Sequence, residues 1–394
     1  MMAALNENIS NKLSGYFNKI DELSEGFVRI WQDVCNIESP TGNKDGVDAV
    51  GEYIIALAEQ RGWKTERFLH DVSGNVVAIT MNQQIDAAPI ALSGHMDTVH
   101  PIGSFGTPAT VVEDGNIYGP GVCDCKGGIV ASLLAMDALY ICGYSARPVM
   151  LLLQSDEENG SKASKKATIG YICEKSKNAI AFLNMEGHTE GEGCLIRKGI
   201  ITYLFTVSGI AAHSSKSANE GANAIAEAAH KILEIEKIKD ADGITCCSSI
   251  ISGGSAVNTV PDSCEFKVNV RYASEEQLKW VENKMKEIAD TVYIKGCKTA
   301  LSTVSFRTSM EYSQKNQALL DKINEAFKIS GLPTLKASKR TGGSDAADVT
   351  AYGIPCIDSL GVRGGKIHTA DEFAIVDSLT EAAKRIVAVV DYFA

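Results

Sequence analysis

The chain has 394 residues, which is too long for one compact core and suits two domains. Hydrophobic residues make up 45% of the chain and charged residues 22%, so we expect a folded protein rather than a disordered one. The formal net charge of −11 argues against nucleic acid or an anionic membrane as a partner, and no apolar run approaches the ~20 residues of a membrane span.

Eleven cysteines are scattered along the chain without any Cys-x-x-Cys pair. The first residues mix charged and apolar side chains at helical spacing and lack the apolar segment of a signal peptide. We therefore expect reduced thiols and a cytoplasmic location. Cys123 and Cys125 flank Asp124, but neighbouring side chains in an extended loop point away from one another, which disfavours the two thiols as ligands beside that acid.

The first half of the chain alternates predicted helices and strands. Amphipathic patterns predict helices over 26–36, 44–62 and 129–140. Short apolar runs predict strands over 74–80, 89–93, 149–155 and 179–183. Short apolar runs of this length are typical of parallel strands buried on both faces. The alternation predicts an α/β domain.

Side chains of the types that bind metals follow the ends of three predicted strands: His95 with Asp97 after 89–93, Glu157 and Glu158 after 149–155, and Glu186 after 179–183. A glycine-rich turn adds a further acid, Asp124. Ligand sites in open α/β sheets gather at the carboxyl ends of the strands. Carboxylate oxygens with imidazole suit zinc or a similar divalent ion. The set predicts a metal site at this edge of the sheet.

The pattern changes after residue 192. Alternating strands and amphipathic helices are predicted over 199–208, 244–251 and 264–271 for the strands and 219–237 and 274–290 for the helices. This β-α-β-β-α order predicts a small inserted α+β domain over 196–306. Residues 1–195 and 307–394 should form the first domain, with a last helix over 375–392.

Six short motifs together resemble a known family. They are His95-Met-Asp97-Thr-Val, Gly119-Pro-Gly followed by Asp124-Cys-Lys-Gly-Gly, Glu157-Glu158-x-Gly, Ala212-His213-Ser-Ser, Asn258-Thr-Val-Pro and His368-Thr-Ala-Asp-Glu. The chain resembles, over nearly its whole length, the co-catalytic di-zinc peptidases: glutamate carboxypeptidase, acetylornithine deacetylase, succinyl-diaminopimelate desuccinylase and aminoacylase. The Gly-Pro-Gly form is most similar to the glutamate carboxypeptidase branch. Cys125 and Ala218 stand where the family usually has methionine and proline.

This resemblance implies an α/β catalytic domain, a mixed sheet flanked by helices, with an inserted ferredoxin-like lid and dimerisation domain. It implies two divalent metal ions per chain, zinc first, with cobalt or manganese as alternatives. Asp124 would bridge the ions. His95 and Glu186 would hold one ion, and Glu158 and His368 the other. Glu157 would be the general base, Asp97 would orient His95, and His213 would bind the tetrahedral intermediate.

The chemistry of these residues agrees with the resemblance. Several carboxylates converging on one pocket repel one another without cations. Glu157 and Glu158 are adjacent and diverge, so one can bind metal while the other accepts a proton. Without the family, His213 would be interpreted as packing at a strand-to-helix corner. His70, His100, His188 and His230 are interpreted as surface or structural residues.

The resemblance also implies that the inserted domain binds a substrate carboxylate. Arg271 and Asn258 are the candidates, with Lys198 as a third, and an arginine can meet a carboxylate through two parallel hydrogen bonds. The alternative for Arg271 is an ordinary surface ion pair. We expect an exopeptidase that releases a C-terminal amino acid such as glutamate from a small peptide, as a homodimer through the inserted domain.

Two other functions stay open at this point. The same site would serve an N-acyl-amino-acid deacylase or a dipeptidase, because fold and metals do not select the acyl group. A catalytically silent binding or regulatory protein would have lost the base or a ligand. Glu157 and all five ligand positions are present, which argues against it.

Overall fold

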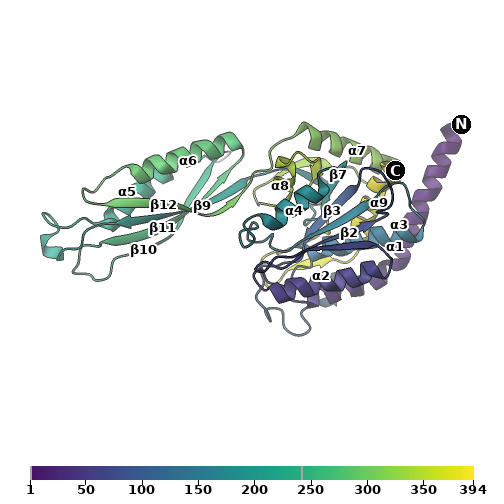
Figure 1. The fold of residues 1–394 in the computed structure, drawn as a ribbon, viewed down its shortest axis with the longest axis horizontal. Coiled ribbons are helices and arrows are strands. Elements are labelled where there is room, and N and C mark those ends of the chain that lie inside the picture. Colours follow the sequence, from purple (N-terminus) through teal and green to yellow (C-terminus); the bar gives the residue numbers. More distant parts are fainter. Residues whose placement is uncertain (1, 241–242) are drawn as a thin grey trace. The chain divides into compact units, whose positions relative to one another are not determined.

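The computed structural model describes residues 2–240 and 243–394, with the side chains of residues 2–11 outside that description. The chain divides into two compact units. Unit 1 comprises Met1–Leu195, Tyr312–Lys339 and Asp348–Ala394, and unit 2 comprises Ile196–Glu311 and Arg340–Ala347. Figure 1 shows a mixed arrangement of helices and strands in unit 1 and a sheet accompanied by helices in unit 2. Residues 307–311 and 340–347 therefore group with the inserted segment.

A six-stranded mixed sheet forms the centre of unit 1. Its strands, in spatial order, are β1 (Lys64–Phe68), β2 (Val76–Met81), β6 (Val149–Gln154), β3 (Ile90–His95), β7 (Ala181–Asn184) and β14 (Cys356–Ile357). From β6 to β14 neighbouring strands are parallel, and β1 and β2 add an antiparallel edge. This confirms the expected mixed sheet.

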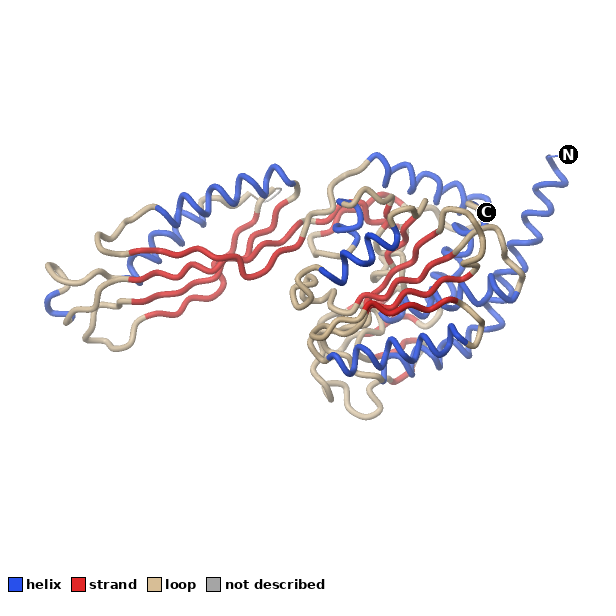
Figure 2. Tube along the Cα trace, viewed as in Figure 1, coloured by secondary structure: helices blue, strands red, loops and turns tan. Residues whose placement is uncertain are grey.

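The parallel strands bring their carboxyl ends to one edge. Every residue of β3, β6 and β7 is buried, as expected of apolar strands covered on both faces. The β3–β6 register pairs His95 with Gln154, and the β3–β7 register pairs Ser93 with Asn184. The residues that follow these strands therefore start from the same edge of the sheet, as Figure 2 lets the reader trace.

Helices flank this sheet. They are α1 (Met2–Asn36), α2 (Lys44–Glu59), α3 (Lys126–Ile141), α4 (Ala167–Ser176), α7 (Gln314–Ser330), the short α8 (Ala346–Ala351) at a unit boundary, and α9 (Ser378–Tyr392). The first helix is a single 35-residue helix that begins well before the predicted residue 26. Its buried side chains Tyr16, Ile20, Phe27 and Trp31 lie on one helical face, so the amphipathic pattern extends further than predicted.

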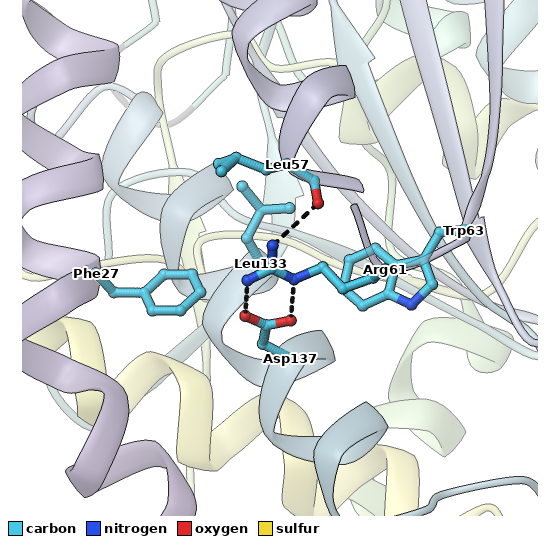
Figure 3. Close-up of a pocket in the computed structure, with 6 residues that line it drawn as sticks. All are labelled: Phe27, Leu57, Arg61, Trp63, Leu133 and Asp137. Carbon is cyan, nitrogen blue, oxygen red and sulfur yellow. Dashed lines mark hydrogen bonds and ion pairs between the residues drawn. The ribbon is translucent and has the colours of Figure 1, made fainter. Parts of the chain in front are cut away.

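An ion pair links the end of α2 to α3. Arg61 donates through Nε and Nη2 to the two carboxylate oxygens of Asp137, at 2.5 Å each, and through Nη1 to the carbonyl of Leu57 (Figure 3). The Asp137 side chain is only 3% exposed, so its charge depends on this partner. The guanidinium therefore fixes the helix end beside α3.

Smaller sheets complete unit 1. A four-stranded sheet joins β15 (Gly364–Gly365), β16 (Phe373–Ile375), β5 (Asn116–Tyr118) and β4 (Val111–Glu113). Because Ile375 pairs with Asn116 in this sheet, the last helix starts at Ser378 rather than at the predicted residue 375. A second, two-stranded sheet pairs β8 (Glu192–Arg197) with β13 (Lys336–Arg340), where the chain passes between units.

Unit 2 is an antiparallel four-stranded sheet with two helices. Its elements are β9 (Gly199–Ser208), the 3-10 turn η1 (Ser214–Lys216), α5 (Ala224–Glu236), β10 (Thr245–Gly253), β11 (Ser263–Tyr272), α6 (Glu275–Asp290) and β12 (Lys298–Arg307). The spatial order is β10-β11-β9-β12, and Phe205 stacks on Phe266 at 4.6 Å in the core. The α5 helix starts later than predicted because the Asn223 side chain accepts the N–H of Ala226.

Over the described part of the chain, none of the helices combines the length and apolar character needed to cross a membrane.

Candidate metal centre

His95 is the last residue of β3 and anchors the site. Its side chain is 1% exposed, and Nδ1 lies 2.8 Å from the carbonyl oxygen of Asp97. That contact directs Nε2 to Asp124 Oδ1 at 3.1 Å and to Glu186 Oε1 at 3.7 Å. The strand end and the Asp97 backbone thus aim one ring nitrogen at two carboxylates.

Asp124 lies between two histidines. Its Oδ1 contacts His95 as above, and its Oδ2 lies 3.1 Å from Nε2 of His368. Glu158 Oε2 is 3.3 Å from the same His368 nitrogen. His368 has a φ of 63°, a left-handed conformation that is costly for a residue with a Cβ and is characteristic of functional sites. Asp124 therefore has a His–Glu pair on each side.

Asp97 holds the turn after β6 in place. Its two carboxylate oxygens accept the backbone N–H groups of Glu157 at 3.0 Å and Glu158 at 3.1 Å, and Thr41 Oγ1 donates to it at 2.7 Å. Burial opposes ionisation of Asp97, but the hydrogen bonds from His95 and its other donors keep its pKa lowered. Asp97 therefore stays a carboxylate that positions both glutamates.

The cluster carries more negative charge than ordinary partners neutralise. Burial raises the pKa of Glu158 to about 7, and burial together with Asp124 raises the pKa of Glu186 well above its usual value. Hydrogen bonds to Asp124 and Glu158 raise the pKa of His368 to about 10. The raised pKa values of Glu158, Glu186 and His368 mean that bound protons are favoured on this cluster. Divalent cations in place of those protons would neutralise the cluster, so this donor set fits them.

Two donor groups within the described residues are compact enough for an ion, with ligand atoms all within 4.8 Å of one another. They are His95 with Asp124 and Glu158, and His95 with Cys125 and Glu186. The Cys125 thiol was disfavoured as a ligand from the sequence, yet its Sγ accepts the backbone N–H of His95 at 3.0 Å. Burial raises the pKa of Cys125, which keeps the thiol protonated in this setting.

The sequence analysis assigned no role to Glu372 and interpreted His100 as a surface or structural residue. The buried Glu372 carboxylate accepts the backbone N–H groups of Cys123 at 2.9 Å, Asp124 at 3.0 Å and Gly121 at 3.3 Å. His100 Nε2 lies 2.6 Å from its Oε2. Glu372 therefore holds the loop that carries Asp124. The available signal was its place at the end of the His368-Thr-Ala-Asp-Glu motif.

The four remaining candidates lie in unit 2. His213 is exposed at the start of η1 and pairs with Thr259, while Ser214 N–H donates to the carbonyl of Asn258 at 2.9 Å. Unit 2 therefore brings His213 and Asn258 onto neighbouring loops. Lys198 is buried, with its ammonium donating to the carbonyl of Gly243 at 2.5 Å.

Arg271 lies on β11 and has only neutral acceptors among the described residues. Nη1 donates to the carbonyl of Thr341 at 2.9 Å, and Nε donates to Asn269 Oδ1 at 3.3 Å. Burial lowers the pKa of Arg271, and Arg307 nearby adds to the effect. Within the described part of the chain, Arg271 therefore does not form the surface ion pair that was its alternative role.

Comparison with known proteins gives consistent matches over most of the chain. Residues 91–392 match Peptidase family M20/M25/M40. The chain is 28% identical over 358 residues to carboxypeptidase G2 of Pseudomonas sp. (strain RS-16), covering 89% of this chain and 84% of that protein. It is 25% identical over 376 residues to succinyl-diaminopimelate desuccinylase of Rickettsia rickettsii (strain Sheila Smith), covering 90% and 96%.

The fold is also found among solved structures. A tripeptidase from Staphylococcus aureus superposes with a TM-score of 0.79 at 22% identity, covering 94% of this chain and 99% of that one. The family match spans far more than half of the chain and agrees with the resemblance drawn from the motifs. The protein therefore belongs to peptidase family M20/M25/M40 and is a metal-dependent hydrolase of that family.

Proposed function

We propose that the protein is a di-metal exopeptidase that releases a C-terminal amino acid, such as glutamate, from a small peptide. The observation that carries this proposal is the symmetric arrangement around Asp124, which has His95 with Glu186 on one side and His368 with Glu158 on the other. Five donors in that arrangement are suited to two ions that share one carboxylate.

The five donors divide naturally between the two ions. Asp124 would bridge, His95 and Glu186 would hold the first ion, and His368 and Glu158 the second. Zinc is the first candidate, with cobalt or manganese accepted by the same oxygen and imidazole donors. When bound, such a pair supplies an acidified water and polarises a carbonyl group.

Glu157 is proposed as the general base. It is 5% exposed and follows directly after the buried end of β6, with its backbone fixed by Asp97. From that position its carboxylate would accept a proton from the attacking water and return it to the leaving nitrogen. Asp97 is proposed to act only through other residues, by orienting the His95 ring and the two glutamates.

His213 is proposed to stabilise the developing oxyanion. Its ring is exposed at a loop tip, and Nδ1 is engaged by Ser215 Oγ at 2.8 Å and by the Ser215 N–H at 3.3 Å. Because Nδ1 accepts the Ser215 N–H, Nε2 is the ring nitrogen that remains available as a donor. Asn258, on the neighbouring loop, is proposed to bind the substrate beside it. Lys198 stays a weaker candidate because its ammonium already has a carbonyl partner.

Arg271 is proposed to bind the terminal carboxylate of the substrate. A partly buried guanidinium with neutral acceptors and a second arginine nearby favours a carboxylate as its missing partner. This requirement for a free carboxylate is what distinguishes a carboxypeptidase from an enzyme that reads the amino end. The similarity to carboxypeptidase G2 supports the same choice.

A second candidate function is the deacylation of N-acyl amino acids. The similarity to a succinyl-diaminopimelate desuccinylase favours it, and such substrates also carry a free carboxylate that Arg271 would bind. A dipeptidase is the third option. These enzymes would use the same residues and differ in the group on the other side of the scissile bond.

We also propose a homodimer formed through unit 2. Its sheet has two edge strands, β10 and β12, and an open edge presents unpaired backbone groups to another strand. Sedimentation or light scattering of the purified protein tests this, and a monomer at micromolar concentration would contradict it.

The deciding experiment is hydrolysis of a substrate panel by chelated protein and by protein restored with zinc, cobalt or manganese. The panel contains dipeptides, N-acyl amino acids and γ-glutamyl or folate-type conjugates. Metal-dependent release of a C-terminal amino acid from peptides supports the carboxypeptidase, and preference for N-acyl amino acids supports the deacylase. No turnover in any metal-restored sample, with two ions bound per chain, would contradict both.

The carboxylate assignment has its own test. Arg271→Ala should raise KM for free-carboxylate substrates strongly, while Lys267→Ala, on the same strand, should leave KM unchanged. An unchanged KM in the Arg271 variant would refute the assignment without touching the metal centre.

A further inference from the structure

A second cavity in unit 1 is lined by charged side chains of both signs and lies outside the metal centre. Its volume is about 250 Å³, and its walls include Glu190, Leu332, Arg363, Glu381, Lys384 and Arg385. These residues come from the loop after β7, the loop after α7, the segment before β15, and α9. Nothing in the proposed hydrolytic mechanism uses them.

Arg385 is the one cation of this group without a carboxylate partner in the described part of the chain. Its Nη2 donates to the carbonyls of Gly361 at 2.8 Å and Leu360 at 3.3 Å. Its Nε is buried and has no acceptor. Burial lowers the pKa of Arg385 to about 10, so the side chain is still a cation at neutral pH. The hydrogen-bond acceptors of this guanidinium are therefore backbone carbonyls, and no carboxylate of the described chain contacts it directly.

The acids of the cavity are already engaged by other cations. Arg363 binds Glu381 through two hydrogen bonds, at 2.7 and 2.9 Å, and Glu190 at 3.3 Å. Lys384 contacts Asp21, outside the cavity lining, at 2.7 Å. Both acids of the lining are thus hydrogen-bonded to Arg363, and Glu381 acts on Arg385 only through its charge, without a hydrogen bond to the guanidinium.

Arg61 shows how this protein normally treats a guanidinium inside unit 1. Its donors meet the two oxygens of Asp137 and the carbonyl of Leu57, and the cavity around it has only about 10 Å³ (Figure 3). Arg385 has carbonyl partners but no acid, and it borders a space some 25 times larger by the two volumes given. The two arginines therefore differ in two respects: Arg385 has no carboxylate in hydrogen-bond contact, and it borders a larger space.

We propose that this cavity binds a small oxyanion, a carboxylate or a phosphate group, on the guanidinium of Arg385. Planar N–H donors suit such oxygens, and charge-assisted hydrogen bonds are stronger than neutral ones. Lys384 at the same wall, whose ammonium also contacts Asp21, adds further N–H donors, and Leu332 supplies an apolar surface for a short carbon chain.

The oxyanion site is separated from the metal centre by one stretch of backbone. Arg385 binds the carbonyl of Gly361, and the N–H of Gly361 donates to the carbonyl of Glu186 at 2.9 Å. The backbone of Leu360 is held in the same way by Asn184, at 3.1 Å. An anion bound to Arg385 would therefore contact a side chain that holds the backbone segment beside Glu186, while remaining outside the group of residues around Asp124.

The test is a calorimetric titration of the metal-loaded protein with inorganic phosphate and, in a separate experiment, with glutarate. We expect one saturable site. Arg385→Met should weaken binding about tenfold or more, since hydrogen bonds to a charged group are lost. Leu332→Trp, which narrows the cavity and keeps the arginine, should also weaken it. Arg67→Met, which removes a surface arginine on β1 paired with Glu52, should have no effect.

The outcomes separate the ligand classes and the sites. Binding of phosphate alone assigns a phosphate site, and binding of glutarate alone assigns a carboxylate site. Binding that persists unchanged in both Arg385→Met and Leu332→Trp belongs to the metal ions and overturns the proposal, as does no binding of either anion. If Arg385→Met shows no cooperative thermal unfolding, Leu332→Trp decides.

Discussion

The two units each bury a group of charged side chains, and the groups differ in how the charge is balanced. In unit 2, Glu227 contacts Lys231 Nζ at 3.1 Å and accepts the backbone N–H groups of Tyr293 at 2.9 Å and Ile294 at 2.6 Å. Lys231 also donates to three carbonyls at the end of α6, from Ile288, Ala289 and Thr291. Both side chains are almost fully buried, and each charge has its partner within the protein.

In unit 1 the carboxylates around Asp124 meet one another. Burial raises the pKa values of Glu158 and Glu186, and hydrogen bonds to Asp124 and Glu158 raise the pKa of His368. The comparison teaches that burial of charge by itself says little about function. A pair that satisfies its own charges supports the fold, whereas a cluster that needs outside cations marks the working site.

The largest expected effect is on Glu157. Glu157→Gln should lower turnover by about 10²–10⁴-fold, because a positioned proton acceptor contributes that much. Metal content and unfolding temperature should not fall, since the change removes a negative charge from a crowded cluster. Elemental analysis, calorimetry and initial rates check this. Glu113→Gln, at an exposed position of β4, is the matched control, and near-normal turnover in the Glu157 variant would remove its role.

The buried Glu227–Lys231 pair of unit 2 should affect stability and leave the metal content unchanged. Lys231→Met should lower the free energy of unfolding by about 3–5 kcal/mol, because it leaves Glu227 buried without its cation. Urea unfolding measures the loss, and metal content should be unchanged. Lys237→Met, which breaks an exposed pair with Glu234, should cost less than about 1 kcal/mol. Similar losses for both lysines would show that the buried network is not special.

His213 tests whether unit 2 takes part in the chemistry. His213→Ala should reduce turnover about a hundredfold or more, as loss of an oxyanion donor does, while two ions stay bound. His230, which stacks on Tyr293 in the same unit, supplies the control variant His230→Ala. A His213 variant with wild-type rates would confine the reaction to the residues of unit 1.

The smallest of these effects is expected at Glu372, which holds the backbone of the loop that carries Asp124. Glu372→Gln should raise the dissociation constant for metal about 10–100-fold, because supporting groups behind metal ligands have effects of that size. Competition with a coloured chelator measures this. Asp371→Asn, at the exposed neighbouring acid, is the control. Equal metal affinity in the two variants would reduce Glu372 to a purely structural residue.

Much of the fold was predictable because it depends on local patterns. The strand predicted over 199–208 coincides with β9, and the apolar runs predicted β3, β6 and β7 within a few residues. Errors came at element ends, where pairing decides. Ile375 was assigned to a helix because its apolar spacing fits one, yet it pairs with Asn116 in a strand from a distant part of the chain.

The site was predictable only in part for the same reason. His95, Asp124 and Glu158 carry recognisable motifs, and the fold brings them together with His368. The Glu372 contacts join residues about 250 positions apart, so no local pattern contains them. Nor does the sequence reveal that Arg385 has no hydrogen bond to a carboxylate. Glu381, on the same helix, hydrogen-bonds to Arg363, and Arg385 donates to backbone carbonyls instead.

The Glu372 contacts also make the Asp124 loop depend on a segment about 250 positions further along the chain. His95, Asp124, Glu158 and Glu186 are translated before His368 and before the carboxylate that secures the Asp124 loop. Closing a loop of that length costs chain entropy before the contacts can stabilise the fold. A chain that has not yet been extended to residues 368 and 372 therefore lacks one histidine of the candidate cluster and the support of its Asp124 loop.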